Sequence, residues 1–308
     1  MPLRAPYHRL LHLARRVVNR LGLNVARSDD YYSPLPLVAE LEKTAARWNR
    51  PSELVGVRYD LDAMEQQLRQ LMASYAPEYA QLPSYEECKQ LGYGPGFTTV
   101  DALLTFCMLR HLKPARYLEI GSGLSTYYAW QAALRNREDG APCELTCIDP
   151  YAGPNLARLQ GVQLVRRPVQ DVEPEFFAQL QAGDVLFIDS THVVKLDGDV
   201  PYLYLEVVPR LNPGVTIHSH DIHFPYNVPH PAEQYIFRAK WPRFWTEAML
   251  LQAFLAYNRD FQLLLAPPLL RHYREEVLRE VIPGYRPVVA GDYDTHFGSV
   301  WYRRVSEE

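Results

Sequence analysis

Carboxylates and imidazoles gather in two short segments that each follow an apolar run. In chain order they are Asp189, His192, His218, His220, Asp221 and His223. A pair of carboxylates is a natural site for a hard cation, and nearby imidazoles shift the preference toward transition metals. A cation there can hold two substrate oxygens and lower the pKa of a hydroxyl, whose proton a neutral histidine removes. We therefore predict Asp189 and Asp221 as ligands of a divalent metal. Two alternatives stay open: Asp189 holds part of a cofactor, and His218 is a core histidine.

A glycine-containing turn follows another strand-like run, at Gly121, Ser122 and Gly123. The glycines let a ligand approach the backbone, and the helix that follows presents free N–H groups. A dinucleotide prefers a third glycine, where this chain has Thr126. Glu119 would repel a pyrophosphate but suits the cationic methionine end of S-adenosylmethionine (SAM). An ordinary strand-to-helix turn is the alternative.

Two further segments strengthen the prediction of a SAM site. Asp149 ends a strand-like run and can accept hydrogen bonds from both ribose hydroxyls, although a surface turn before Pro150 is the alternative. Gln170 follows the third such run, where a side chain can meet the adenine ring. The predicted cofactor residues are Glu119, Gly121, Ser122, Gly123, Asp149, Gln170 and Asp189.

The elements that must position these residues begin at Arg116, where short β-rich runs alternate with helical stretches. The runs are Tyr117 to Ile120, Glu144 to Ile148, Val162 to Val165, Val185 to Ile188, Val215 to about Asp221, Phe261 to Leu265 and Ser299 to Tyr302. This alternation predicts an α/β fold, a doubly wound and mostly parallel sheet with helices on both faces. Adjacent strand ends lie only about 5 Å apart at one edge, so the polar residues are expected to converge.

The N-terminal third lacks strand-like runs and reads as a helical extension over residues 1–95, followed by the main domain over residues 96–308. Helical periodicity covers Leu37 to Trp48 and Leu61 to Tyr75. Residues 1–27 form a basic amphipathic pattern, with arginines opposite an apolar face. Such a helix either lies on an anionic membrane surface or packs on its own domain or on a second subunit.

The composition limits the partners. A formal net charge of −4 without a concentrated basic surface argues against a nucleic-acid substrate. No apolar run approaches the length of a membrane span, and the N-terminus lacks the pattern of a signal peptide. The four cysteines fit no zinc or redox spacing, which predicts buried, reduced thiols. We expect a cytoplasmic protein, with residues 1–27 as the candidate contact to the inner face of the membrane.

Three segments resemble a bacterial family of class I SAM-dependent methyltransferases that includes macrocin-type sugar O-methyltransferases. They are Phe187 to Lys195, Pro209 to Ile222 and Trp245 to Asn258. The resemblance covers about residues 95–305 and implies a seven-stranded Rossmann-like sheet whose last strand, Gly298 to Arg303, runs antiparallel. In metal-dependent members, an Asp-x-His after the fifth strand supplies a metal ligand and a base, which Asp221 and His223 match. In that family an acidic residue can stand directly before this aspartate, whereas this chain has His220 there.

These observations predict methyl transfer from SAM to a hydroxyl of a sugar or glycosylated metabolite. Asp189 and Asp221 would hold Mg²⁺ or Mn²⁺ or orient the acceptor, with His223 or His192 as the base. The expected partners are a small-molecule or glycan acceptor and a second copy of the chain. Two other functions remain open: a nicotinamide-dependent oxidoreductase that uses the same loop, and a membrane-surface scaffold without turnover.

Overall fold

The structure, a computed structural model, describes residues 13–23, 31–94 and 96–305. The chain divides into two compact units, Met1–Trp48 and Asn49–Glu308. The division lies nearer the N-terminus than the boundary at residue 95 that the sequence predicts. The reason is α4 (Leu61–Tyr79), whose buried face packs against α6 and β6 of the larger unit.

The first unit is helical in its described part. Residues 13–20 are helical, and α2 (Val38–Lys43) and α3 (Ala45–Trp48) replace the single helix predicted for Leu37 to Trp48. The amphipathic pattern of residues 1–27 falls largely outside the described residues. Among the residues that the structure describes, no helix is long and apolar enough to span a membrane.

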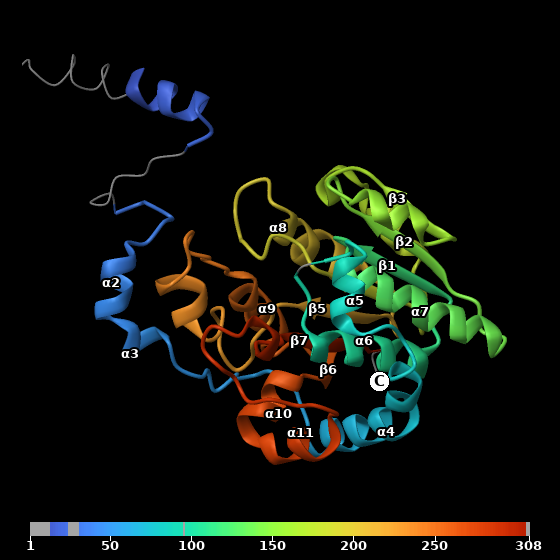
Figure 1. Ribbon diagram of the computed structural model, residues 1–308. Helices are drawn as coiled ribbons and strands as arrows, with labels where there is room; N and C mark the ends of the chain where they lie inside the picture. The colour runs from blue at the N-terminus through green and yellow to red at the C-terminus, as the bar shows by residue number, and fades with distance from the viewer. Residues whose placement is uncertain (1–12, 24–30, 95, 306–308) are drawn as a thin grey trace, which may run out of the picture. The chain divides into compact units, whose positions relative to one another are not determined.

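The second unit contains a seven-stranded sheet with the order β3-β2-β1-β4-β5-β7-β6 (Figure 1). The strands are β1 (Arg116–Ile120), β2 (Glu144–Ile148), β3 (Val162–Val165), β4 (Val185–Ile188), β5 (Thr216–His220), β6 (Phe261–Leu265) and β7 (Ser299–Arg304). The first five pair in parallel, and β7 runs antiparallel to both β5 and β6. The predicted fold is confirmed, including the antiparallel last strand.

Helices flank this sheet. Their bounds are α5 (Tyr85–Gln90), α6 (Thr99–Leu112), α7 (Leu124–Glu138), α8 (Asp199–Tyr202), α9 (Glu247–Leu255), α10 (Pro267–Tyr273) and α11 (Glu275–Val281). Helices α6 and α7 pack on each other, and α4 packs with α10 and α11 although they are far apart in the sequence (Figure 1). Every residue of β4 and β5 is buried. Strands covered on both faces are uniformly apolar as a rule, so the two histidines of β5 need a specific explanation.

The strand order reverses between β1 and β4. Because such crossovers are right-handed, the connection from β1 to β2 through α7 and that from β4 to β5 through α8 lie on opposite faces. Ligands of open α/β sheets bind at the carboxyl edge beside such a reversal. Here the last residue of β1, Ile120, pairs with Ile148 of β2 and Ile188 of β4. The residues that follow these three isoleucines therefore meet at one edge.

Candidate functional site

The glycine loop sits directly against the end of β4. Gly121 has φ +94°, and a Cβ built on it would lie 2.3 Å from the backbone oxygen of Asp189. Only glycine fits both the backbone conformation and the space. Two bonds join the three strand ends: Gly121 N–H donates to Ile148 O over 3.0 Å, and Asp189 N–H donates to Ile120 O over 2.9 Å.

Asp149 is held beside the loop by two donors. The hydroxyl of Ser122 donates to Asp149 Oδ2, and the N–H of Tyr151 donates to Oδ1 over 2.7 Å. Each carboxylate oxygen keeps a second lone pair for another donor. Gln170 points its amide at the carbonyl of Asp197, over 3.3 Å, in the segment after β4. The structure thus brings Ser122 and Asp149 together and places Gln170 beside a different segment.

Glu119 lies beneath the loop and is fully buried. Its Oε1 accepts a hydrogen bond from the hydroxyl of Ser125 in the first turn of α7. Burial, with a smaller contribution from Asp189, raises the pKa of Glu119 to about 8, so the carboxyl is largely neutral at pH 7. The sequence suggests that Glu119 contacts the cationic end of the cofactor directly. Its burial and its neutral form do not favour such a contact. Glu119 instead supports the start of α7 from below.

Asp189, His192, His220 and Asp221 form one cluster after β4 and β5. His192 Nε2 lies 3.3 Å from Asp189 Oδ1 and 3.5 Å from Asp221 Oδ2. His220 Nδ1 lies 3.3 Å from Asp189 Oδ1 and 3.9 Å from Asp221 Oδ2. The Asp189 side chain is 26% exposed, whereas both imidazoles are buried, so the cluster opens to solvent on the Asp189 side.

His192 is anchored by the start of α9. Its backbone oxygen accepts the N–H groups of Thr246 and Glu247, and its Nδ1 lies 2.8 Å from Glu247 Oε2. Glu247 is itself fixed, because the hydroxyl of Tyr204 donates to its other oxygen over 2.7 Å. His192 and Asp221 have φ of +60° and +56°. A left-handed conformation in two clustered residues other than glycine is a form of strain that concentrates at functional sites.

His220 is anchored from the opposite side. Its Nε2 lies 3.3 Å from Asp101 Oδ2, a fully buried carboxylate of α6. The hydroxyls of Thr98 and Ser299 also donate to Asp101, over 2.7 and 2.5 Å. The ring of His220 packs against Phe97 at a centroid distance of 4.7 Å. Its Nδ1 faces the cluster and has no hydrogen-bond partner in the described part of the chain.

The charges of the cluster depend on one another. At Asp189, burial opposes ionisation, but His220 and His192 outweigh it and hold the pKa below its ordinary value. At Asp221, burial prevails over the same two imidazoles and raises the pKa to about 6. Burial also disfavours the charged form of His192, but Asp189 and Glu247 outweigh it and raise the pKa to about 10. Neighbouring positive charge therefore stabilises the ionised form of both aspartates against the effect of burial.

The two remaining histidines of these segments lie elsewhere. His223 is buried, with Nε2 3.2 Å from the carbonyl oxygen of His296 and its ring beside Tyr235. The structure thus places the predicted base His223 against the chain before β7, whereas His192 lies in the cluster. The ring of His218 stacks on that of Trp301 at a centroid distance of 3.8 Å, and among the described residues neither ring nitrogen finds a hydrogen-bond partner. It is the core histidine that the sequence allowed.

Two anchoring carboxylates, Asp101 and Glu247, are absent from the sequence-predicted site. They lie far from their histidines along the chain, 119 positions from His220 and 55 from His192. The sequence signal for such a role is an acidic residue in a helical stretch that is otherwise mostly apolar. The four cysteines are free thiols, as predicted, with Cys143 partly exposed.

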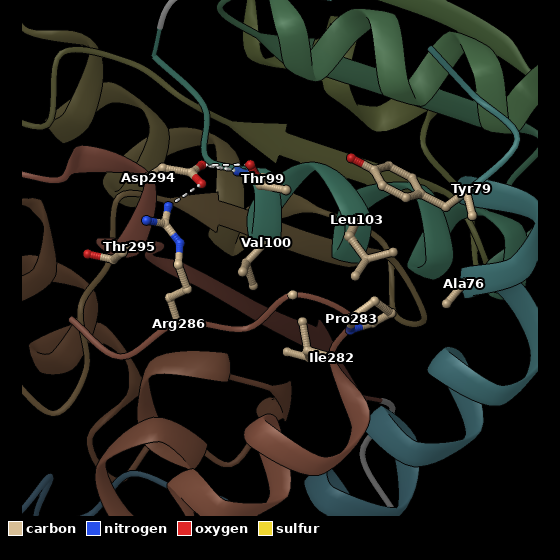
Figure 2. A pocket seen from close by; sticks show the side chains of 12 residues that line it. Ala76, Tyr79, Thr99, Val100, Leu103, Ile282, Pro283, Arg286, Asp294 and Thr295 are labelled. Carbon is tan, nitrogen blue, oxygen red and sulfur yellow. Dashed lines mark hydrogen bonds and ion pairs between the residues drawn. The ribbon is translucent and has the colours of Figure 1, made fainter. Parts of the chain in front are cut away.

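A separate cavity of about 100 Å³ lies between α4, α6 and residues 282–295. Figure 2 shows its lining, in which Thr99 donates to Asp294 and Arg286 pairs with the same carboxylate. The charged groups at its rim are paired with each other, and the rest of the lining is mostly apolar. It therefore lacks the convergent polar groups that mark the strand-end cluster.

Comparison with known proteins identifies the domain. Residues 118–222 match the family model described as a methyltransferase domain. This segment runs from the glycine loop through Asp189 and Asp221, so the cluster belongs to it. The chain therefore contains a methyltransferase domain, which confirms the sequence prediction at that level.

More distant similarities extend over longer parts of the chain. An uncharacterised protein of Archaeoglobus fulgidus is 29% identical over 194 residues, which cover 57% of this chain and 86% of that protein. An O-methyltransferase from Bacillus cereus, solved with S-adenosylhomocysteine (SAH), is 12% identical with a TM-score of 0.40, covering 87% of this chain and 97% of that one. An O-methyltransferase of tomaymycin synthesis from Streptomyces achromogenes, solved with SAM, is 13% identical with a TM-score of 0.42, covering 87% and 96%.

Proposed function

We propose that this methyltransferase domain transfers a methyl group from SAM to a hydroxyl oxygen of a sugar or glycosylated metabolite, with a divalent metal at Asp189 and Asp221. One observation carries the proposal: the glycine loop and the carboxylate–imidazole cluster meet at Gly121, where the backbone of Asp189 closes on the loop. A methyl donor in the loop and an acceptor at the cluster would thus be neighbours.

The loop fits SAM better than a dinucleotide. Thr126 stands where a dinucleotide site prefers a third glycine, and its hydroxyl accepts the N–H of Gly123 over 3.0 Å. That N–H is therefore not free for a pyrophosphate. Asp149, with one lone pair left on each oxygen, can accept both ribose hydroxyls, and Ser122 fixes its orientation.

The cluster fits a divalent cation because both carboxylates lie within 3.5 Å of the same buried imidazole nitrogen, Nε2 of His192, and Asp189 is open to solvent. Bound there, Mg²⁺ or Mn²⁺ would act as a Lewis acid toward an acceptor hydroxyl. Asp189 and Asp221 would hold the ion.

His192 is the better placed of the two predicted bases. Its Nε2 lies beside both aspartates, and Glu247 fixes the ring through Nδ1. A divalent cation at the aspartates would offset the negative charge that raises the pKa of His192, and the neutral imidazole would then accept the proton of a hydroxyl oriented there. The rest of the rate acceleration would come from proximity, because the methyl donor and the acceptor hydroxyl are held in line and water is excluded.

Titration calorimetry of the full chain with SAH tests the cofactor. We expect binding that weakens by roughly tenfold or more in Asp149→Asn, because an NH2 donor replaces one of the two acceptor oxygens and the remaining oxygen already accepts one bond. The matched control is Asp260→Asn, an aspartate that precedes β6 at the opposite edge of the sheet. Binding of NADH without binding of SAH would overturn the proposal in favour of an oxidoreductase.

Turnover tests the acceptor. The full chain, incubated with SAM and a panel of glycosides, is expected to form SAH and an O-methyl product that mass spectrometry detects. Chelator should abolish the reaction and added metal should restore it. Methylation of amines in preference to every hydroxyl acceptor would contradict the assignment.

A further inference from the structure

The imidazole of His220 is directed into the carboxylate pair by the fold. We propose that His220 Nδ1 is a ligand of the metal ion held by Asp189 and Asp221, and that this mixed nitrogen and oxygen set selects a transition metal over Mg²⁺. The inference rests on the proposed function, which places a divalent metal at the two aspartates.

The position of Nδ1 suits a ligand. Ligand atoms at about 2.0–2.2 Å from one ion lie roughly 3 to 4.4 Å from each other. Nδ1 lies 3.3 Å from Asp189 Oδ1 and 3.9 Å from Asp221 Oδ2, within that range. One ligand atom from each of the three residues lies within 4.8 Å of the other two.

The hydrogen bonding of His220 points the same way. Nδ1 is buried and, despite its short distances to the aspartates, makes no hydrogen bond with any residue that the structure describes. A buried nitrogen without a hydrogen bond is destabilising, and a ligand bond would remove that cost. Histidine ligands of metals commonly pass their other N–H to a carboxylate, and Nε2 of His220 lies 3.3 Å from Asp101. With an ion bound in place of the second proton, this contact favours the tautomer that keeps its proton on Nε2 and offers the Nδ1 lone pair to the ion.

The environment also prevents His220 from turning away. Its side chain is fully buried on β5, next to Phe97 and Phe187. Asp101 is fixed in turn by Thr98 and Ser299. The ligand nitrogen is therefore held in place before any ion arrives.

An imidazole ligand changes which metal binds. Mg²⁺ takes oxygen ligands in a strict octahedron, whereas imidazole suits later first-row metals, and affinity rises from Mn²⁺ to Co²⁺ and beyond. The open side at Asp189 leaves room for substrate oxygens in the remaining positions. We therefore expect Mn²⁺ and Co²⁺ to bind in preference to Mg²⁺.

Binding of Mn²⁺ to the chelator-treated full chain tests the preference for Mn²⁺ over Mg²⁺. Electron paramagnetic resonance of free Mn²⁺ should show one ion bound per chain, which a hundredfold excess of Mg²⁺ does not displace. Spin-echo modulation of the bound Mn²⁺ should show coupling to an imidazole nitrogen. Displacement by Mg²⁺ at comparable concentration, or a spectrum without nitrogen coupling, would overturn the inference.

Two variants and a control test the residue. His220→Glu restores an all-oxygen set and should lower the preference for Mn²⁺ over Mg²⁺ by about tenfold or more, with loss of the nitrogen coupling. Asp101→Asn keeps His220 and should weaken Mn²⁺ binding by about 10- to 100-fold, and it decides the question where His220→Glu does not fold. The control is His218→Phe on the same strand, which should leave Mn²⁺ binding unchanged. Unchanged selectivity in His220→Glu, or unchanged Mn²⁺ affinity in Asp101→Asn, would refute the role of His220.

SAH binding to the same samples separates the two claims. A chain that binds SAH but no Mn²⁺ refutes the metal ligand and leaves the methyl donor standing. A chain that binds Mn²⁺ through His220 but no SAH refutes the proposed function and leaves the metal site standing.

Discussion

The contact between Gly121 and Asp189 makes a quantitative prediction about Gly121→Ala. At φ +94°, an alanine adopts a conformation that costs about 1–2 kcal/mol. Its Cβ would also lie 2.3 Å from the backbone oxygen of Asp189, so β1 and β4 must separate at their ends. Overpacking of this kind costs roughly 1–3 kcal/mol. The sum predicts a loss of about 2–5 kcal/mol in the free energy of unfolding.

Gly140→Ala is the matched control. Gly140 has φ +81° but nothing within 4 Å of an added Cβ, so its substitution carries only the backbone cost, about 1–2 kcal/mol. Urea unfolding followed by tryptophan fluorescence compares both variants with the unchanged protein. The folded Gly121→Ala protein should also bind SAH more weakly, because the loop and Asp189 no longer meet correctly. Equal destabilisation by the two substitutions, within about 0.5 kcal/mol, would refute the close approach of loop and strand.

Two other predictions concern buried groups. Glu119 has a folded-state pKa of about 8 against an ordinary 4.5. The folded protein therefore keeps a proton that the unfolded chain releases between these pH values. The free energy of unfolding should fall by a few kcal/mol as pH rises from about 4.5 to 8. Glu119→Gln cannot ionise and should flatten this dependence in urea midpoints measured between pH 5 and 8; an unchanged slope would show that Glu119 does not cause it. His218→Phe should keep or raise the unfolding free energy, because the imidazole stacks on Trp301 and neither nitrogen is hydrogen-bonded to a described residue. A loss of more than about 2 kcal/mol in thermal unfolding would mean that His218 has a polar partner after all.

Periodicity and residue type were enough to predict the seven strands and the edge at which the functional groups lie. Apolar runs of four to six residues ending in Gly121, Asp149 or Asp189 specify buried parallel strands, because such strands are covered on both faces. The carboxyl ends of parallel strands share an edge, so the meeting of the glycine loop with both aspartates follows from local pattern alone.

The roles of individual side chains at that edge required the tertiary structure. Glu119 precedes the loop in sequence, but it points beneath α7 and is enclosed, so its carboxyl tends toward the neutral form. His223 stands two residues after Asp221, but the left-handed backbone at Asp221 ends the strand alternation and carries His223 toward His296. A helical or extended pattern cannot be continued through such a turn.

The sequence by itself therefore determined the fold, the glycine loop and the presence of paired aspartates, since these depend on neighbours along the chain. The tertiary structure decided which histidines face those aspartates. His192 and His220 are oriented by Glu247 and Asp101, carboxylates 55 and 119 positions away. An imidazole is oriented by the partner of its second nitrogen, and packing across the sheet, rather than spacing along the chain, supplies that partner.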